Sequence, residues 1–150
     1  MNDYFDILSF NAAVDDIPYM GYTTRIDRAL RLTQISMFTK ENGARAVAPK
    51  FLVLLTDGAQ TWYKDAEDPS VIGKELRKKG VTIFTIGIGN NTKTRELIET
   101  SGSRDKSFNA ASFDVLMGDT FVKGITDAVC SAGKKDITYL ALIAFLNVPY

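Results

Sequence analysis

A short, unbroken apolar run is the feature of this sequence that most restricts its fold. Residues Phe51 to Leu55 are all apolar, and they lead directly into Thr56-Asp57-Gly58. A run of this length that ends in a turn dipeptide is typical of a β-strand buried on both faces. Such a strand belongs to a parallel sheet with helices above and below it. Because ligands bind at the carboxyl ends of the strands in these sheets, Asp57 is the first candidate site residue.

A strand–helix–strand unit follows this run. Asp68-Pro69 predicts a helix start, with a capping side chain followed by proline at the first helical position. The helix is expected to end at Lys79-Gly80, and Val81 to Ile88 is a second apolar segment rich in β-branched residues. Two strands joined by a helix run parallel with a right-handed crossover. The predicted fold class is therefore α/β: a partial doubly wound, Rossmann-like parallel sheet with helices on both faces.

The remaining segments alternate between helices and loops. Apolar residues spaced three and four apart predict one helix over residues 3–16 and another over residues 25–38. Thr24 stands where it can cap the first turn of the second helix. Asp65, Glu67 and Asp68 favour a solvated acidic loop over a binding face. The other predicted elements are a short helix over 94–100, a short strand over 108–111, a helix from Ser112 to Cys130 and an apolar strand within 137–150.

Composition excludes several functional classes. The 150 residues are enough for one domain with a real core. Eighteen basic residues balance eighteen acidic ones, so no net field attracts nucleic acid. No apolar run approaches the roughly 20 residues that a membrane-spanning helix needs. Histidine, the commonest general base, is absent. The first residues do not resemble a secretory signal, so secretion is expected to require a longer precursor.

An ordered set of motifs resembles a known family. Its members are Gly21-Tyr22-Thr23-Thr24-Arg25 with the helix after it, the strand into Thr56-Asp57-Gly58, Val81 to Gly89, and Ser112-Phe113. Together they are similar to the von Willebrand factor type A domain, particularly its extracellular-matrix members of the matrilin and collagen VI kind. The likeness covers roughly residues 3 to 130. It implies a doubly wound sheet with a metal-ion-dependent adhesion site at its carboxyl edge.

The resemblance implies a divalent cation, Mg²⁺ or Mn²⁺, at that site. Thr24 resembles the threonine of the family's second ligand loop, and Asp57 resembles the aspartate of its third. Hydroxyl and carboxylate oxygens of this kind suit Mg²⁺. The first loop of the family, Asp-x-Ser-x-Ser, has no counterpart here, so the predicted adhesion site is incomplete. Two plainer interpretations stay open: Asp57 as a turn residue and Thr24 as a helix cap.

The last residues suggest a division of the chain. Residues 1–133 are predicted to be the C-terminal portion of a domain of this family, and 134–150 an apolar tail. Lys135 to Leu142 is similar to the lead-in of a family first strand, with Leu142 where the metal-binding aspartate would stand. The tail is therefore either an added strand beside the Phe51 strand or the start of a further domain. Otherwise, a second copy of the chain is expected to pair with that exposed edge.

The predicted function is a non-enzymatic protein-binding or adhesion module, located outside the cell and acting on a matrix or cell-surface protein. One alternative is a Mg²⁺-dependent hydrolase or phosphotransferase that uses Asp57 as its nucleophile. Another is a truncated, self-associating fragment without a ligand. The predicted partner-contacting residues all lie near the carboxyl edge of the sheet: Thr23, Gly58, Gln60, Thr61, Trp62 and Tyr63.

Overall fold

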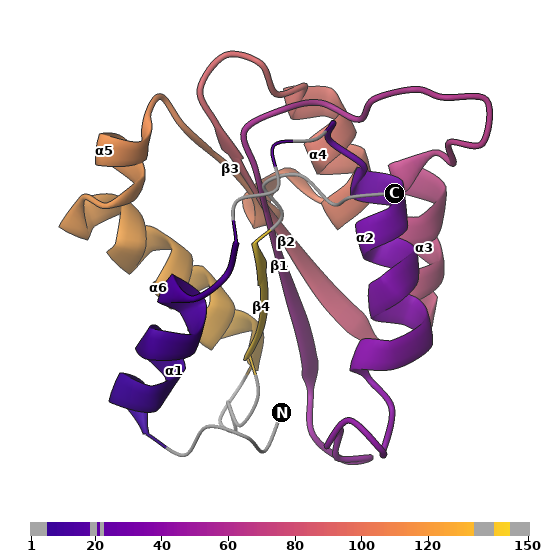
Figure 1. Ribbon diagram of the computed structural model, residues 1–150, viewed down its shortest axis with the longest axis vertical. Helices are drawn as coiled ribbons and strands as arrows, with labels where there is room; N and C mark the ends of the chain where they lie inside the picture. The colour runs from indigo at the N-terminus through magenta and orange to yellow at the C-terminus, as the bar shows by residue number, and fades with distance from the viewer. Residues whose placement is uncertain (1–5, 19–20, 22, 134–139, 145–150) are drawn as a thin grey trace.

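The computed structural model describes residues 6–18, 21, 23–133 and 140–144. Within these ranges the strands form one sheet in the order β3-β2-β1-β4, and every neighbouring pair is parallel (Figure 1). The sequence-based α/β assignment is confirmed. The strands are β1 (Lys50–Thr56), β2 (Val81–Ile88), β3 (Ser107–Ala110) and β4 (Leu140–Ala144).

Helices cover both faces of the sheet, with α2, α3 and α4 on one side and α6 on the other (Figure 1). No helix within the described ranges combines the length and hydropathy needed to cross a membrane. The helices are α1 (Ile7–Asp15), α2 (Ile26–Leu32), α3 (Pro69–Lys78), α4 (Thr94–Ser101), α5 (Phe113–Leu116) and α6 (Asp119–Gly133), with a π-helical turn η1 (Thr33–Met37) and a 3-10 turn η2 (Arg104–Lys106).

The central strand β1 separates two hydrophobic cores. Leu52 and Leu54 lie in the cluster that α2 and α3 cover, whereas Phe51 and Val53 lie in the cluster that includes Val129 of α6. Successive side chains of a strand point to opposite faces, so one apolar run serves both cores. All four β1 side chains are at most 2% exposed. The run that dominates the sequence is therefore the centre of the fold.

The strand register places the candidate site and the tail. Thr56 at the end of β1 pairs with Gly87 of β2, so the two carboxyl ends meet at the same edge of the sheet. On its other side β1 pairs with β4, from Phe51 opposite Leu140 to Leu55 opposite Ala144. The edge of β1 that we expected the tail to cover is thus occupied by residues 140–144. The rest of the predicted tail strand lies outside the described residues.

The predicted helix over residues 25–38 is in fact two segments. The α-helix ends at Leu32, and a π-helical turn continues to Met37. The hydroxyls of Thr33 and Ser36 donate hydrogen bonds to the carbonyls four residues earlier, at 2.9 Å and 2.7 Å. Such bonds compete with the backbone pattern of a regular helix, which accounts for the change of geometry.

Thr24 is not the helix cap that the sequence predicted. Arg25 occupies the N-cap position of α2 and makes no side-chain capping bond. The expected caps of two other helices are confirmed, because the Asp68 carboxylate accepts a bond from the Ser70 N–H and the Ser112 hydroxyl accepts one from Val115. Thr24 is thereby left available for another role.

The predicted first and last helices also differ from expectation. No residue of α1 is buried, although its apolar side chains follow the predicted spacing. Ile7, Phe10 and Val14 are 67%, 43% and 46% exposed, and spacing alone does not reveal this exposure. The helix predicted from Ser112 to Cys130 is interrupted at Gly118, whose carbonyl accepts the first bonds of α6 from Phe121 and Val122. Glycine is a poor helix interior residue, so the break falls there.

Two helical glycines allow a direct test of the packing. A Cβ on Gly73 of α3 would overlap the carbonyl oxygen of Thr100 in α4, whereas a Cβ on Gly124 of α6 would meet nothing within 4 Å. We expect Gly73→Ala to lower the free energy of unfolding, because a clash of about 1–3 kcal/mol outweighs a helix-propensity gain of about 1 kcal/mol. Gly124→Ala should raise stability by up to about 1 kcal/mol. Urea denaturation measures both, and equal stabilisation by the two variants would contradict the described α3–α4 contact.

Candidate functional site

The candidate site lies where two loops meet at the carboxyl edge of the sheet. The Thr56 hydroxyl donates to the Gly58 carbonyl at 2.8 Å and accepts from the Gly58 N–H at 3.2 Å, which shapes the turn that carries Asp57. A Cβ on Gly58 would lie 2.7 Å from the Thr24 hydroxyl oxygen, so only glycine permits this close approach. The Thr61 N–H donates to the Thr24 carbonyl at 2.8 Å. The segments that hold Thr24 and Asp57 are thus adjacent.

A buried ion pair fixes the start of α2. Arg25 and Asp27 are 3% and 2% exposed. The Arg25 guanidinium donates from Nε to Asp27 Oδ1 at 2.9 Å and from Nη2 to Asp27 Oδ2 at 2.8 Å. A two-bond pair of this kind holds both side chains in a single relative orientation. Because it is buried, the loss of either partner leaves an uncompensated charge.

Gln60 completes this buried cluster, so the prediction that it contacts a partner is wrong. Its side chain accepts from the Asp27 N–H at 3.0 Å and donates to Asp27 Oδ1 at 2.8 Å. Its backbone N–H donates to Glu96 Oε1 at 3.0 Å. With 3% exposure, Gln60 cannot reach a binding protein. It instead joins the loop after β1 to α2 and α4.

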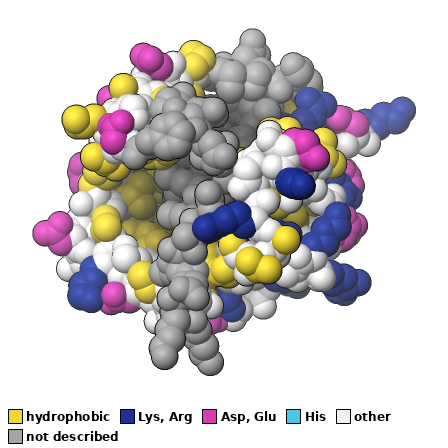
Figure 2. Space-filling view, turned by 90° about the horizontal axis from the view of Figure 1, so that it is seen from below, with side chains coloured by type: hydrophobic (Ala, Val, Ile, Leu, Met, Phe, Trp, Pro, Cys, Tyr) yellow, Lys and Arg dark blue, Asp and Glu magenta, His cyan; other side chains and the backbone are white. Residues whose placement is uncertain are grey.

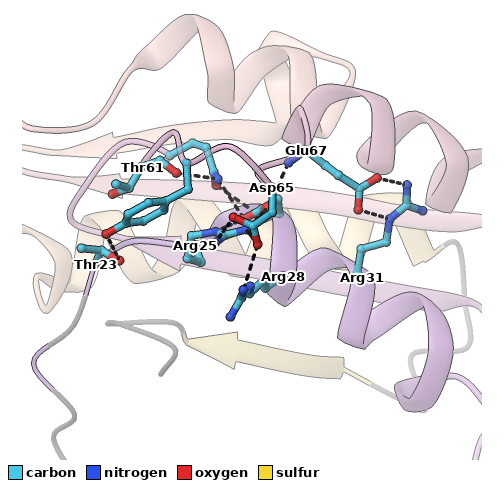
Figure 3. Close-up of polar contacts among 10 residues, drawn as sticks. Thr23, Arg25, Arg28, Arg31, Thr61, Asp65 and Glu67 are labelled. Carbon is cyan, nitrogen blue, oxygen red and sulfur yellow. Dashed lines mark hydrogen bonds and ion pairs between the residues drawn. The ribbon is translucent and has the colours of Figure 1, made fainter. Parts of the chain in front are cut away.

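The loop between Gln60 and Glu67 is also tied to α2 by an outer row of ion pairs. Arg25, Arg28 and Arg31 follow one another along the helix and face the acidic loop (Figure 3). Arg28 pairs with Asp65 at 3.0 Å, and Arg31 pairs with Glu67 at 2.5 Å and with Glu75 of α3 at the same distance. The expected solvated acidic loop is confirmed: the Asp65 and Glu67 side chains are 59% and 50% exposed, and each also pairs with an arginine of α2. These outer pairs are partly exposed and individually weak.

The electrostatics keep the central pair charged. Burial raises the pKa of Asp27, but hydrogen bonds from Arg25, from the Glu67 N–H and from Gln60 outweigh it and lower the pKa to about 2. The hydrogen bond to Asp27 also raises the pKa of Arg25 above its usual value. The Glu67 N–H reaches Asp27 Oδ2 at 3.1 Å, so this carboxylate holds both ends of the loop. Its negative charge has a structural role.

Two aromatic side chains project from the loop that this network holds. Trp62 is 55% exposed and Tyr63 is 39% exposed. The Arg25 guanidinium lies 5.5 Å from the centre of the Tyr63 ring, within the range of a cation–π interaction. The Tyr63 hydroxyl donates a long hydrogen bond of 3.4 Å to the Thr23 hydroxyl. Of the predicted contact residues, Thr23, Thr61 and Tyr63 thus lie in one group beside exposed Trp62.

The described residues at this edge do not complete a metal site on their own. Thr24 and Asp57 supply a hydroxyl and a carboxylate, whereas Mg²⁺ prefers an octahedral shell of oxygens. Among the described residues there is no group of three or more Asp, Glu, His or Cys side chains that could hold an ion. Glu96 is near, but its carboxylate accepts the Gln60 N–H.

Four residues of this network were not among the site residues predicted from the sequence: Arg25, Asp27, Arg28 and Arg31. One signal was present, because arginines at positions 25, 28 and 31 repeat every three residues and so lie near one another on a helix. Their partners are remote in sequence, however, and nothing in the loop spacing identifies Asp65 and Glu67 as those partners.

The fold and this edge agree with a family match. The sequence model of the von Willebrand factor type A domain matches residues 1–122. The chain belongs to the von Willebrand factor type A domain family. Curated relatives include the human collagen alpha-5(VI) chain, 36% identical over 148 residues, which covers 98% of this chain and 5% of the collagen. The rabbit (Oryctolagus cuniculus) collagen alpha-1(XII) chain is 34% identical over 81% of this chain and 18% of its own length.

Solved structures give the same family assignment. Proximal thread matrix protein 1 from the mussel byssus superposes with a TM-score of 0.67 at 30% identity, over 87% of this chain and 30% of that protein. A structure of the same protein with a zinc-occupied MIDAS motif gives a TM-score of 0.69 at 29% identity. This von Willebrand factor type A chain therefore spans only a small part of each of these relatives.

The pH dependence of stability tests the buried pair. The pKa of Asp27 is about 2 in the folded protein and about 3.9 in an unfolded chain. The folded protein therefore binds fewer protons than the unfolded chain. The contribution of Asp27 to the free energy of unfolding is complete above about pH 4 and is lost as the pH falls through about 2. We expect Asp27→Asn to cost about 3–5 kcal/mol at neutral pH, because Arg25 loses its counter-charge. The variant should also show a flatter loss of stability in acid.

Urea denaturation from pH 7 to pH 2 measures both effects. The control is Asp15→Asn, which alters an exposed carboxylate on α1 and should leave the pH profile unchanged. If Asp27→Asn and Asp15→Asn gave the same profile, the assigned role of the Arg25–Asp27 pair would be wrong.

Proposed function

We propose that this domain is a non-enzymatic protein-binding module of the extracellular matrix that recognises its partner through Trp62 and Tyr63. The observation that carries the proposal is the exposure of these two rings on a loop held at both ends by the buried Arg25–Asp27–Gln60 cluster. Tryptophan and tyrosine are enriched among residues that dominate binding energy. A loop that is already ordered loses little entropy on binding.

Thr23, Gly58 and Thr61 are the proposed surroundings of these rings. Thr23 meets the Tyr63 hydroxyl, and the Thr61 N–H holds the adjacent Thr24 segment. Gly58 keeps the two loops close, as its contact with Thr24 requires. These residues would support the shape of the surface, whereas the two rings would supply most of the contact area.

The kinds of protein among the relatives support the matrix setting. Collagen chains and a byssus thread matrix protein share the domain, although this chain corresponds to about 5% of each collagen VI chain that it matches. We therefore propose an extracellular location and a matrix or cell-surface protein as partner. The alternative of a hydrolase or phosphotransferase has less support. The sequence contains no histidine that could act with Asp57, and the described residues contain no acidic cluster that could hold a metal ion.

Thr24 and Asp57 are the proposed residues nearest to any bound Mg²⁺ or Mn²⁺. An ion held by these two oxygens would need further ligands from water or from a partner's carboxylate. We propose that the Trp62–Tyr63 surface binds its partner without this ion. Self-association through the sheet edge is the remaining proposal for a partner, and it would use the outer edge of β4 because β4 already pairs with β1.

Surface plasmon resonance with immobilised triple-helical collagen tests the proposed surface. We expect the domain to bind and Trp62→Ala to weaken binding by about 30-fold, the effect of losing a dominant contact residue. Phe113→Ala on α5 is the matched control, because Phe113 is 51% exposed and Trp62 is 55% exposed. Equal weakening by the two variants, or binding that neither affects, would overturn the proposed surface.

The same experiment in EDTA tests the role of the ion. We expect binding in EDTA to equal binding in Mg²⁺, with Asp57→Ala close to wild type. Loss of binding both in EDTA and in Asp57→Ala would show that a cation completes the site. The surface would then have to be assigned to the Thr24–Asp57 edge.

A further inference from the structure

A groove at the opposite end of the sheet forms a second surface. It has a volume of about 670 Å³ and is lined by Phe38, Lys40, residues 44–47 and Lys50. Lys50 begins β1 and Asp57 follows its end. At about 3.3 Å per residue, the strand separates the two surfaces by about 20 Å. The groove is thus independent of the Trp62–Tyr63 surface.

The loop that forms the groove is held by its own hydrogen bonds. The Asn42 and Ala44 N–H groups donate to the Thr39 carbonyl at 3.2 Å and 3.0 Å, and the Gly43 N–H donates to the Lys40 carbonyl at 3.0 Å. The Asn42 side chain donates to the Ser36 carbonyl at 2.7 Å. Gly43 has a φ of 84°, a conformation that favours glycine. The groove is therefore largely preformed.

Positive charge is concentrated at this end of the molecule. Among the described residues, the charged side chains that line the groove are Lys40, Arg45 and Lys50, all of them cationic. Neither Lys40 nor Lys50 forms an ion pair with any described residue, whereas the arginines of α2 are paired with acids. Glu41 adds one exposed acid to the loop. Because the whole chain has no net charge, this local excess is a distinct feature.

Lysines from α3 extend the same charged end. Lys78 and Lys79 lie at the C-terminus of α3, and only Gly80 separates them from Val81, which pairs with Lys50 in the sheet. Figure 2 looks onto this end and shows Lys and Arg side chains beside hydrophobic ones. An anionic partner would therefore meet several cations around the groove.

The groove also presents apolar surface next to these cations. Val47 is 97% exposed. Phe38 packs one side against the core cluster of α2, β1 and α3 and contributes to the groove lining. An exposed valine and an aromatic ring in one groove can bury an apolar side chain of a partner. A bare polyanion has no such side chain.

We propose that this groove binds an acidic peptide segment that carries an apolar side chain between its carboxylates. The carboxylates would meet Lys40, Arg45 and Lys50, and the apolar side chain would pack on Phe38 and Val47. A sulfated polysaccharide would satisfy the cations but not the apolar lining. With partners at both ends of the sheet, the domain would join two proteins, a role beyond the single-surface function proposed above.

Fluorescence anisotropy with a fluorescein-labelled Glu-Leu-Glu-Glu-Leu-Glu peptide tests this on the whole chain. We expect binding that weakens by about tenfold or more in the double variant Lys40→Glu/Lys50→Glu, because attraction becomes repulsion. Lys64→Glu/Lys93→Glu is the matched control: it makes the same change in net charge at exposed lysines outside the groove. That control should bind as wild type does. Val47→Ser, which changes no charge, should weaken binding severalfold.

Two further peptides separate the contribution of the carboxylates from that of the apolar side chains. A Gln-Leu-Gln-Gln-Leu-Gln peptide and a Glu-Ser-Glu-Glu-Ser-Glu peptide should each bind more weakly than the first. Equal binding by the serine peptide would reassign the groove to a bare polyanion. The same reassignment would follow if heparin displaced the first peptide and Val47→Ser left its binding unchanged. Equal weakening by the two double variants, or no binding of the first peptide, would overturn the proposal.

Discussion

The buried pair between Arg25 and Asp27 is the interaction on which the arrangement of the site depends. One carboxylate accepts bonds from Arg25, from the side chain of Gln60 and from the backbone of Glu67. The loop after β1 is therefore joined to α2 at Gln60 and again at Glu67. The free-energy cost of removing both charges from water is offset only while each charge keeps its hydrogen-bond partners. The placement of the loop that carries Trp62 and Tyr63 follows from this cluster.

The sheet provides the frame in which the cluster can form. The apolar side chains of β1 fill the cores on both faces, so the strand fixes α2 on one side and α6 on the other. Its end presents Asp57 and the loop to α2, and its start carries Lys50 into the basic groove. β4 covers the edge of β1 that β2 leaves open. One strand thus positions two surfaces that face opposite ends of the molecule.

The frame of the fold was more predictable from the sequence than the site. The β1 run, the strand–helix–strand unit and the Asp68-Pro69 helix start depend on local patterns, and these are confirmed. Gln60 was assigned to the wrong role, because an amide in a loop gives no local sign that a carboxylate 33 residues earlier will bind it. The ion pairs of Asp65 and Glu67 also depend on side chains distant in sequence. The exposure of α1 depends on what covers its apolar face, and helical spacing does not encode this.

Hydrogen exchange of the loop amides, followed by NMR, tests the central claim most directly. The Thr61 and Glu67 N–H groups donate to Thr24 and Asp27, so both should be protected in the wild type. In Asp27→Asn, protection should fall at these two amides while the β1 amides stay protected. If Thr61 and Glu67 exchanged in the wild type at the rate of an unstructured peptide, the loop would not be held by the buried pair. The proposed origin of the Trp62–Tyr63 surface would then be wrong.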